Sequence, residues 1–212
     1  MVTFATQKLR IATEMVRDDL ASGGELETVL EQHYQDAVER YANEKFWFNS
    51  IVTTATTTAS VATISVPATV QTVERLTIPA YDLTIDEVNL SELPDYSTEG
   101  IPEFYSYLND TLKFWPTPDA VYTLNVYGVA YIAAPTAAAD DTIWTNQAAP
   151  LIRAHTKMTL YRGVFRDAGG TELALAETKD AYAALKQETA RRLKKPLRSE
   201  RGSRSFDINI GR

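Results

Sequence analysis

The sequence predicts an α+β protein: a four-helix bundle of two N-terminal and two C-terminal helices, with a β-rich insertion between its halves and a flexible C-terminal tail. Three observations predict this fold. Apolar residues recur every three or four positions at both ends of the chain. The middle is rich in Thr and Val and alternates with period two. The end of the chain is basic and contains Pro and Gly.

These observations divide the chain into four units. The expected units are an N-terminal helical hairpin (residues 1–49), a β-rich insertion (50–134), a C-terminal helical hairpin (135–195) and an extended basic tail (196–212).

The N-terminal region predicts two antiparallel helices joined by a short turn. The first apolar stripe has helical spacing and consists of Leu9, Ala12, Val16 and Leu20. The glycine-rich stretch Ser22–Gly24 stops this helix. A second stripe with the same period follows it and consists of Leu26, Leu30, Tyr34, Ala37 and Tyr41.

The middle of the chain predicts a sheet of six or seven strands. Expected strands include Val61–Val66, Arg75–Ile78 and Asp82–Ile85, with Pro79 confined to a break between two of them. The Asn109–Asp110 pair marks a turn before the strand "TLKFWP". Alternation from Tyr122 to Tyr127 predicts a long final strand.

The C-terminal region returns to the helical period. Pro150 suits the first turn of a helix whose apolar side carries Leu151, His155, Met158, Tyr161 and Phe165. The stretch Ala168–Gly170 is expected to end this helix, and Thr171 is the expected N-cap of the last one. That last helix runs to Arg192, and Pro196 stops it.

Composition excludes several classes of protein. At 44% hydrophobic and 23% charged residues, the chain has the composition of a soluble globular protein. It contains no cysteine, which excludes disulfides, zinc–thiolate sites and cysteine nucleophiles. The N-terminus becomes charged before any apolar signal region develops, and the nearly apolar run Val126–Ala139 is too short to span a bilayer. We therefore expect a soluble protein without a membrane partner.

The polar residues predict neither catalysis nor a cofactor. The two histidines, His33 and His155, lie in helical stretches without an acid or nucleophile at a spacing typical of a triad, which favours core positions. They also fall short of the patterns of zinc or di-iron sites. The pair Asp140–Asp141 precedes a helix. An interaction of their negative charge with the helix dipole is therefore favoured over a role as calcium ligands. We expect a protein that is not an enzyme, with no metal and no cofactor.

A set of aromatic residues has two interpretations. Its members are Phe46, Trp47, Phe48, Phe114 and Trp115. They could form a stacking platform for sugars or bases, or they could seal the seam between the helices and the sheet. The second interpretation is favoured.

The order of motifs resembles a known family. "EKFWFN" closes the second helix, a Thr-rich strand pair ends in "ISVP", and "LTIP" follows. The most specific element is "LKFWPTPDAVYTLNVYG" (Leu112–Gly128), a strand, a Pro-x-Pro turn and an aromatic strand. With a "DD" loop and two final helices, this order resembles the head-to-tail adaptor proteins of tailed bacteriophages, also called head-completion or connector proteins.

The resemblance implies an architectural function at the neck of the virion, after assembly in the host cytoplasm. It implies a homo-oligomeric ring, dodecameric in the virion, that binds the portal protein above and a tail or tail-completion protein below. Packaged DNA would pass through the ring without specific binding. Residues 1–190 carry a net charge of −13, which would repel the DNA backbone, although solubility explains this charge equally well.

The basic tail has two interpretations. From Arg191 onward, eight Lys/Arg and two acids give +6, within a chain total of −7, as in a DNA-contacting arm. This favours an alternative function, a nucleic-acid-binding accessory protein. The segment "SFDINI", however, alternates with period two: Phe206, Ile208 and Ile210 share one face, and Asp207 and Asn209 share the other.

That alternation is typical of a peptide that adds a strand to a partner's sheet. We therefore predict that residues 206–210 dock on the portal, while Arg198, Arg201 and Arg204 make secondary electrostatic contacts. A glycan-binding module is a third hypothesis, motivated by the aromatic residues and the Thr-rich strands, but the chain shows no signal peptide.

Overall fold

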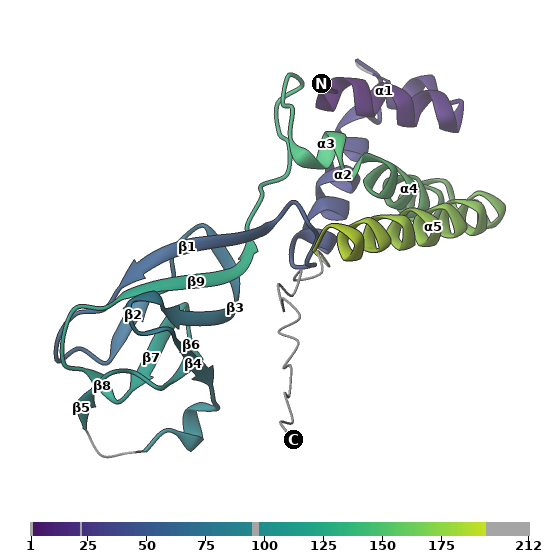
Figure 1. Ribbon diagram of the computed structural model, residues 1–212. Coiled ribbons are helices and arrows are strands. Elements are labelled where there is room, and N and C mark those ends of the chain that lie inside the picture. Colours follow the sequence, from purple (N-terminus) through teal and green to yellow (C-terminus); the bar gives the residue numbers. More distant parts are fainter. Residues whose placement is uncertain (1, 22, 95–97, 194–212) are drawn as a thin grey trace, which may run out of the picture.

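A computed structural model of the chain describes residues 2–21, 23–94 and 98–193. The helices gather in one body and the strands in another, which we call the helical body and the β body (Figure 1). Two segments connect them, residues 43–49 and 131–142. The predicted combination of helices and sheet, α+β overall, is therefore confirmed.

The helical body is organised around one central helix. Its helices are α1 (Phe4–Met15), α2 (Glu27–Ala42), α3 (Ile143–Asn146), α4 (Ala149–Leu160) and α5 (Ala168–Leu193). Helix α4 packs against α5, α2 and α1, so residues from both ends of the sequence share one apolar core. The fully buried side chains of that core include Phe4, Leu30, Tyr34, Trp144 and Ile152.

The predicted four-helix bundle is wrong. Helix α1 ends at Met15 because Val16 adopts a left-handed conformation (φ 55°), and Leu20 lies in a separate 3-10 turn, Asp18–Leu20. The chain therefore changes direction before α2 begins. Helix α1 lies across the top of the helical body and packs mainly on α4 (Figure 1). The short helix α3 adds a fifth member that the apolar period did not predict.

The predicted break at Ala168–Gly170 is also wrong. After α4 the chain continues as a π-helical segment, Tyr161–Phe165, and the break falls at Arg166, whose φ is 53°. Asp167 then accepts a hydrogen bond from the Gly170 amide (3.1 Å), so Asp167, and not Thr171, caps α5. A Cβ at Gly170 would lie 2.7 Å from the Tyr161 ring, which explains a glycine at this crowded start.

The β body is a curled seven-stranded sheet. The strand order is β1-β9-β3-β4-β6-β7-β2, so β1 and β2 form its two edges. The strands are β1 (Ser50–Thr56), β2 (Thr63–Ser65), β3 (Val70–Ile78), β4 (Leu83–Glu87), β6 (Phe104–Leu108), β7 (Thr111–Trp115) and β9 (Thr123–Ala130). A small parallel pair, β5 (Glu99–Gly100) with β8 (Thr117–Pro118), lies beside it.

Several predicted features of the sheet are confirmed. Strands β3 and β4 pair antiparallel, with Pro79 in the 3-10 turn between them. Asn109 and Asp110 both have positive φ and form the turn between β6 and β7. The long final strand exists as β9 and pairs with both β1 and β3.

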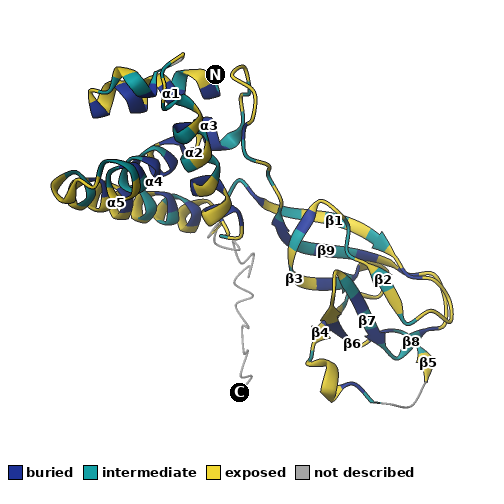
Figure 2. Ribbon diagram, turned by 180° about the vertical axis from the view of Figure 1, so that it is seen from behind, coloured by how far each residue is buried: buried dark blue, intermediate teal, exposed yellow. Residues whose placement is uncertain are grey.

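The β body has its own apolar core, which shares no residue with the helical core. Leu76, Ile78, Ile85, Leu124 and Val126 are among its buried residues. Figure 2 shows buried positions both between the helices and within the curled sheet. At Gly128 the strands β9 and β3 approach so closely that a Cβ would lie 2.1 Å from the Thr72 carbonyl oxygen.

Candidate assembly surfaces

The two histidines occupy different environments within the helical body. The Tyr41 hydroxyl and Nδ1 of His155 are hydrogen-bonded at 3.0 Å, and the two rings meet edge to face. Burial, followed by the nearby Arg40 guanidinium, lowers the pKa of His155 below its ordinary value. His33 lies two turns before Tyr41 on α2 and is half-buried. His155 thus acts as a packed hydrogen-bond partner of Tyr41.

The Asp140–Asp141 pair stabilises its own loop. Asp140 accepts hydrogen bonds from the amides of Thr136 and Ala137, both at 2.8 Å, and these bonds lower the pKa of its carboxyl. Thr142, and not either acid, is the N-cap of α3. Within residues 2–21, 23–94 and 98–193, no three His, Cys, Asp or Glu side chains are grouped as metal ligands.

The length and apolar character of the helices bear on whether one of them could span a membrane. Among the described residues, none of the helices combines the length and the apolar character that crossing a bilayer requires.

The C-terminal end of α5 is fixed to the segment that joins the two bodies. Lys186 donates a hydrogen bond to Glu44 at 2.6 Å, and the Trp47 amide donates to the Thr189 hydroxyl at 3.3 Å. The Arg192 guanidinium carbon lies 3.8 Å from the centre of the Trp47 ring. We call these five residues the neck clamp. They hold the last turns of α5 against the segment that joins the two bodies.

The neck clamp is supported by charge on the last two turns of α5. Glu188 accepts hydrogen bonds from Arg191 and Arg192, and these two guanidinium groups lower the pKa of its carboxyl from 4.5 to about 2. The Lys186 ammonium likewise lowers the pKa of Glu44. Arg192 is therefore oriented by Glu188 on one side and by Trp47 on the other.

The five aromatic residues do not form a single seam. Phe46 and Phe48 stack on each other (ring centres 5.3 Å apart), and Phe48 meets Trp144 edge to face, so this group belongs to the helical core. Phe114 is buried in the β core, and Trp115 packs against Phe104. Only the first group lies at the junction of the two bodies, so the expected seam is half correct.

The predicted docking residues lie outside the described residues. This holds for Phe206, Asp207, Ile208, Asn209 and Ile210, and for Arg198, Arg201 and Arg204. The structure describes the chain up to Leu193, where α5 ends, one residue after Arg192 of the neck clamp.

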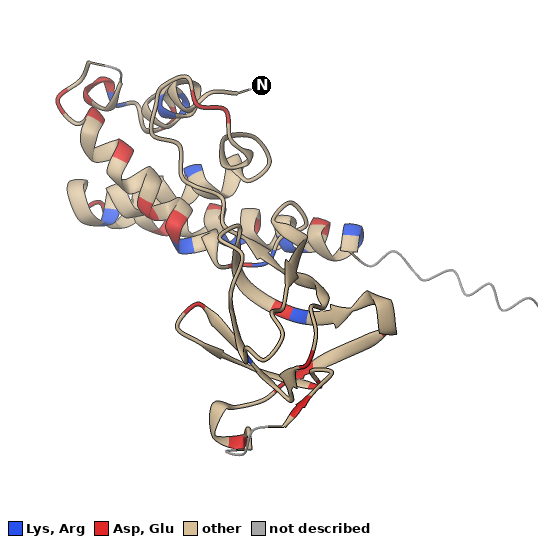
Figure 3. Cartoon of the chain, turned by 90° about the vertical axis from the view of Figure 1, so that its left-hand side faces the viewer, with Lys and Arg blue, Asp and Glu red and all other residues tan. Residues whose placement is uncertain are grey.

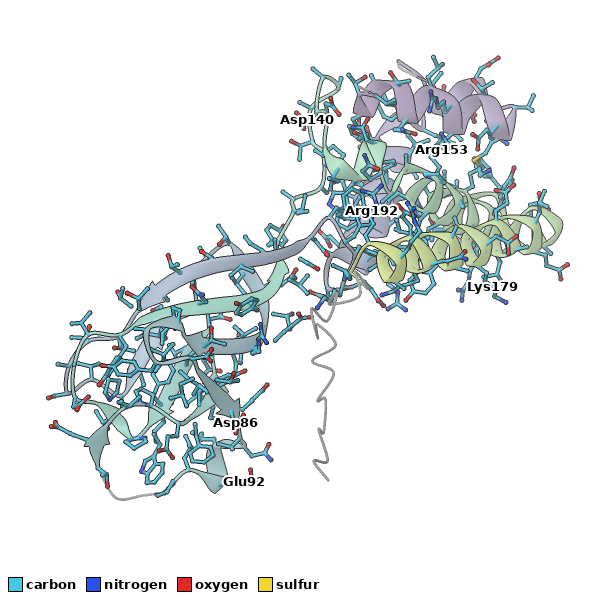
Figure 4. The ribbon with its side chains drawn as sticks, viewed as in Figure 1. Asp86, Glu92, Asp140, Arg153, Lys179 and Arg192 are labelled. Atoms are coloured by element: carbon cyan, nitrogen blue, oxygen red, sulfur yellow. The ribbon has the colours of Figure 1, made fainter. Side chains whose placement is uncertain are left out.

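The β body carries most of the net negative charge of residues 1–190, because it has few basic residues. Between residues 50 and 134 the sequence has ten Asp/Glu and only two basic residues, Arg75 and Lys113. Figure 3 shows acidic positions on several of its strands and loops, and Figure 4 shows Asp86 and Glu92 on the part of the β body far from the helices. The net charge of −13 assigned to residues 1–190 is therefore unevenly distributed.

A comparison with protein families identifies the chain. The family model of the SU10 adaptor protein matches residues 3–204, which includes both bodies, the neck clamp and the start of the tail. The chain belongs to the SU10 adaptor protein family. The resemblance to phage head-to-tail adaptors is thereby confirmed. No curated protein matches the chain, and residues 206–210 lie beyond the range that the family model matches.

Sequence reasoning missed the neck clamp of this adaptor protein. The spacing of Glu188, Arg191 and Arg192 could have predicted the pairs within α5. The contact between Trp47 and Arg192 joins residues far apart in the sequence, and nothing in the local pattern of either one indicates it.

Proposed function

We propose that this member of the SU10 adaptor protein family forms a homo-oligomeric ring in the virion neck, joining the portal protein to a tail or tail-completion protein. The observation that carries the proposal is the family match over residues 3–204. The role is architectural, without catalytic turnover, cofactor or membrane partner. By the family resemblance the assembled ring is dodecameric.

The two-body architecture supports a connecting role. Each body has a separate apolar core, so each can present its own surface to a different neighbour without repacking the other. The neck clamp fixes the start of the tail at the junction of the bodies. A tail anchored there can extend toward a partner while the body remains folded in the ring.

The tail is proposed to attach the ring to the portal. Residues 206–210 would add a strand to a portal sheet, with Phe206, Ile208 and Ile210 as apolar anchors. Arg198, Arg201 and Arg204 would add weaker contacts to acidic side chains. One tail would bind weakly. When a ring of tails meets a ring of portal subunits, the high effective concentration of each tail near its site would raise the overall affinity.

Packaged DNA is proposed to pass through the ring without specific binding. The β body, with its ten acids and two basic residues, would repel phosphate groups if it lines the channel. A nucleic-acid-binding function would rest on the tail alone, because the basic excess lies there.

Mixing the purified protein with its portal tests the proposal. We expect ring-shaped complexes in negative-stain images and no retardation of DNA in a mobility-shift assay. A protein that stays monomeric with the portal and retards DNA with a steep salt dependence would favour the nucleic-acid-binding function instead.

Two doubly substituted variants test the role of the tail. Phe206→Asp with Ile208→Asp should abolish portal attachment, because charge is costly to bury at these anchors. The matched control, Arg201→Ser with Arg204→Ser, should weaken attachment modestly, and mainly at low salt. An essential arginine pair with a dispensable apolar pair would identify the tail as an electrostatic arm.

A further inference from the structure

Strand β1 has an outer edge with no backbone partner among the described residues. It is the terminal strand of the sheet, and its seven residues pair on one side only, with β9. The register with β9 is unbroken from Ser50 to Thr56, so no bulge distorts the strand. Figure 1 shows β1 along the border of the β body, with β9 as its neighbour in the sheet.

The register identifies which backbone groups point outward. The Ala130 amide donates to the Asn49 carbonyl (2.7 Å), and the Thr57 amide donates to the Tyr122 carbonyl (3.0 Å). Hydrogen-bonded pairs alternate along an antiparallel ladder, so Ile51, Thr53 and Ala55 also face β9. The N–H and C=O groups of the residues between them, such as Val52 and Thr54, therefore point away from the sheet.

This edge lacks the features that usually prevent strand addition. Natural sheets protect long edges with charged residues, proline or bulges. The β1 sequence, SIVTTAT, contains no charge and no proline, and Val52 has 57% of its surface exposed. The opposite edge strand, β2, has only three residues. The β1 edge is thus the better strand acceptor of the two.

We propose that the β1 edge holds the C-terminal segment of its own subunit, residues 206–210, as an added strand in the free protein. The two faces of β1 match the alternation of that segment. Ile51 and Ala55 are half-buried against the β core, which suits Phe206, Ile208 and Ile210. The other face carries Ser50, Val52, Thr54 and Thr56, all exposed, which suits Asp207 and Asn209.

The root of the tail favours the same subunit as the source. Trp47, whose amide binds Thr189 of α5, lies three positions before β1 begins. In this proposal residues 194–205 would serve as the tether, and a flexible chain of twelve residues has a root-mean-square length of about 20 Å and an extended length of about 40 Å. Strand β1 is about 23 Å long. The tether therefore reaches every position along it.

The proposal concerns the free subunit and adds a second position for the segment that, by the function proposed above, docks on the portal. Portal attachment would draw this segment off β1. The two ideas can fail separately, because one is measured on the isolated protein and the other on the complex with the portal.

Amide hydrogen exchange on the free protein tests the proposal. The Val52 and Thr54 amides should exchange roughly tenfold more slowly in the full chain than in a chain that ends at Arg204. The Thr53 and Ala55 amides, which bind β9, should exchange equally in both proteins and serve as internal controls. Equal exchange of Val52 and Thr54 in the two chains would overturn the proposal.

Crosslinking identifies the subunit that supplies the strand, against a background without natural cysteine. Val52→Cys combined with Asp207→Cys or with Asn209→Cys should form an intramolecular disulfide. This disulfide should form several-fold faster than the one between Val52→Cys and Ile208→Cys, because residue 208 would lie on the opposite face of the added strand. Equal rates would contradict the strand, and a disulfide-linked dimer as the main product would assign the strand to a second copy.

A proline substitution tests the edge without changing the tail. Val52→Pro removes one outward amide and none that binds β9, so the sheet should keep its fold. The Thr54 amide should then exchange as fast in the full chain as in the chain ending at Arg204. Retained protection of Thr54 in Val52→Pro would show that its protection does not come from strand addition.

Discussion

Arg192 lies on the face of the Trp47 ring, with its guanidinium carbon 3.8 Å from the ring centre. Trp47 belongs to the segment that leads from α2 into the β body, and Arg192 to the last turn of the final helix. The contact therefore joins the end of the helical body to the junction with the sheet, where the tail begins.

The first prediction concerns this contact. Arg192→Ala should lower the free energy of unfolding by about 0.5–1 kcal/mol, because an exposed cation–π pair contributes an amount of that order. A double-mutant cycle with Trp47→Leu, measured by urea unfolding, should give a coupling energy of the same size. Arg191→Ala is the matched control, since Arg191 also binds Glu188 but does not lie on Trp47. A coupling energy of zero would contradict a role for the pair.

The second prediction concerns the acid dependence of the neck clamp. The two arginines lower the pKa of Glu188 from 4.5 to about 2 in the folded protein. A lowered carboxyl pKa stabilises the fold above the unfolded-state value, and that stabilisation is lost as the pH falls through the folded-state value. The stability difference between the natural protein and Glu188→Gln should therefore shrink as the pH falls from about 4.5 to about 2.

This acid dependence can be measured by urea unfolding at a series of pH values. Glu103→Gln, at an exposed position on the β body, provides a control for the loss of one carboxylate. If the Glu188→Gln difference is constant over that range, the carboxylate of Glu188 does not stabilise the clamp.

The third prediction concerns His155. Burial lowers its pKa in the folded protein, so below the ordinary value of 6.5 the unfolded chain binds more protons than the folded one. Stability should therefore fall as the pH decreases below about 6.5, and His155→Gln should flatten this part of the profile. Thermal unfolding across that range measures it, with His33→Gln for comparison. An unchanged profile in His155→Gln would exclude His155 as its source.

The fourth prediction concerns the close approach of β9 and β3. Gly128→Ala should destabilise the protein by about 1–3 kcal/mol or more, because its Cβ would lie 2.1 Å from the Thr72 carbonyl oxygen. Gly169→Ala is the control. Gly169 lies in α5, and its added Cβ would lie 3.6 Å from the Asp167 carboxylate, an ordinary contact distance. Because alanine favours a helix more than glycine does, this change should be neutral or stabilising by up to about 1 kcal/mol. Urea unfolding of both variants checks the contrast, and equal effects would refute it.

The fifth prediction follows from the two separate cores. Leu124→Ala should destabilise the β body by about 2–5 kcal/mol, and Ile152→Ala should destabilise the helical body by a similar amount. Residue-resolved hydrogen exchange should show the loss of protection confined to the mutated body in each case. Loss of protection throughout the chain in both variants would show that the bodies unfold as one unit.

Several elements of the sheet follow from the sequence because their signals are local. The Asn109–Asp110 turn requires two residues that tolerate positive φ, and Pro79 can lie only where no ladder hydrogen bond is needed. The alternation from Tyr122 to Tyr127 depends only on which face of one strand is buried. The family resemblance followed from the order of such elements, and the match over residues 3–204 confirms it.

The tertiary structure decided how the helices are arranged and where the chain's surfaces meet. An apolar period shows that a helix has a buried face, but it does not say which helix covers that face. The period predicts α1 and α2 as a hairpin, whereas α1 packs mainly on α4 and meets α2 through side chains such as Phe4 and Tyr34. Val16 and Arg166 adopt left-handed conformations that their residue types do not predict. The Trp47–Arg192 contact and the unpaired edge of β1 depend on long-range packing, which no local pattern in the sequence specifies.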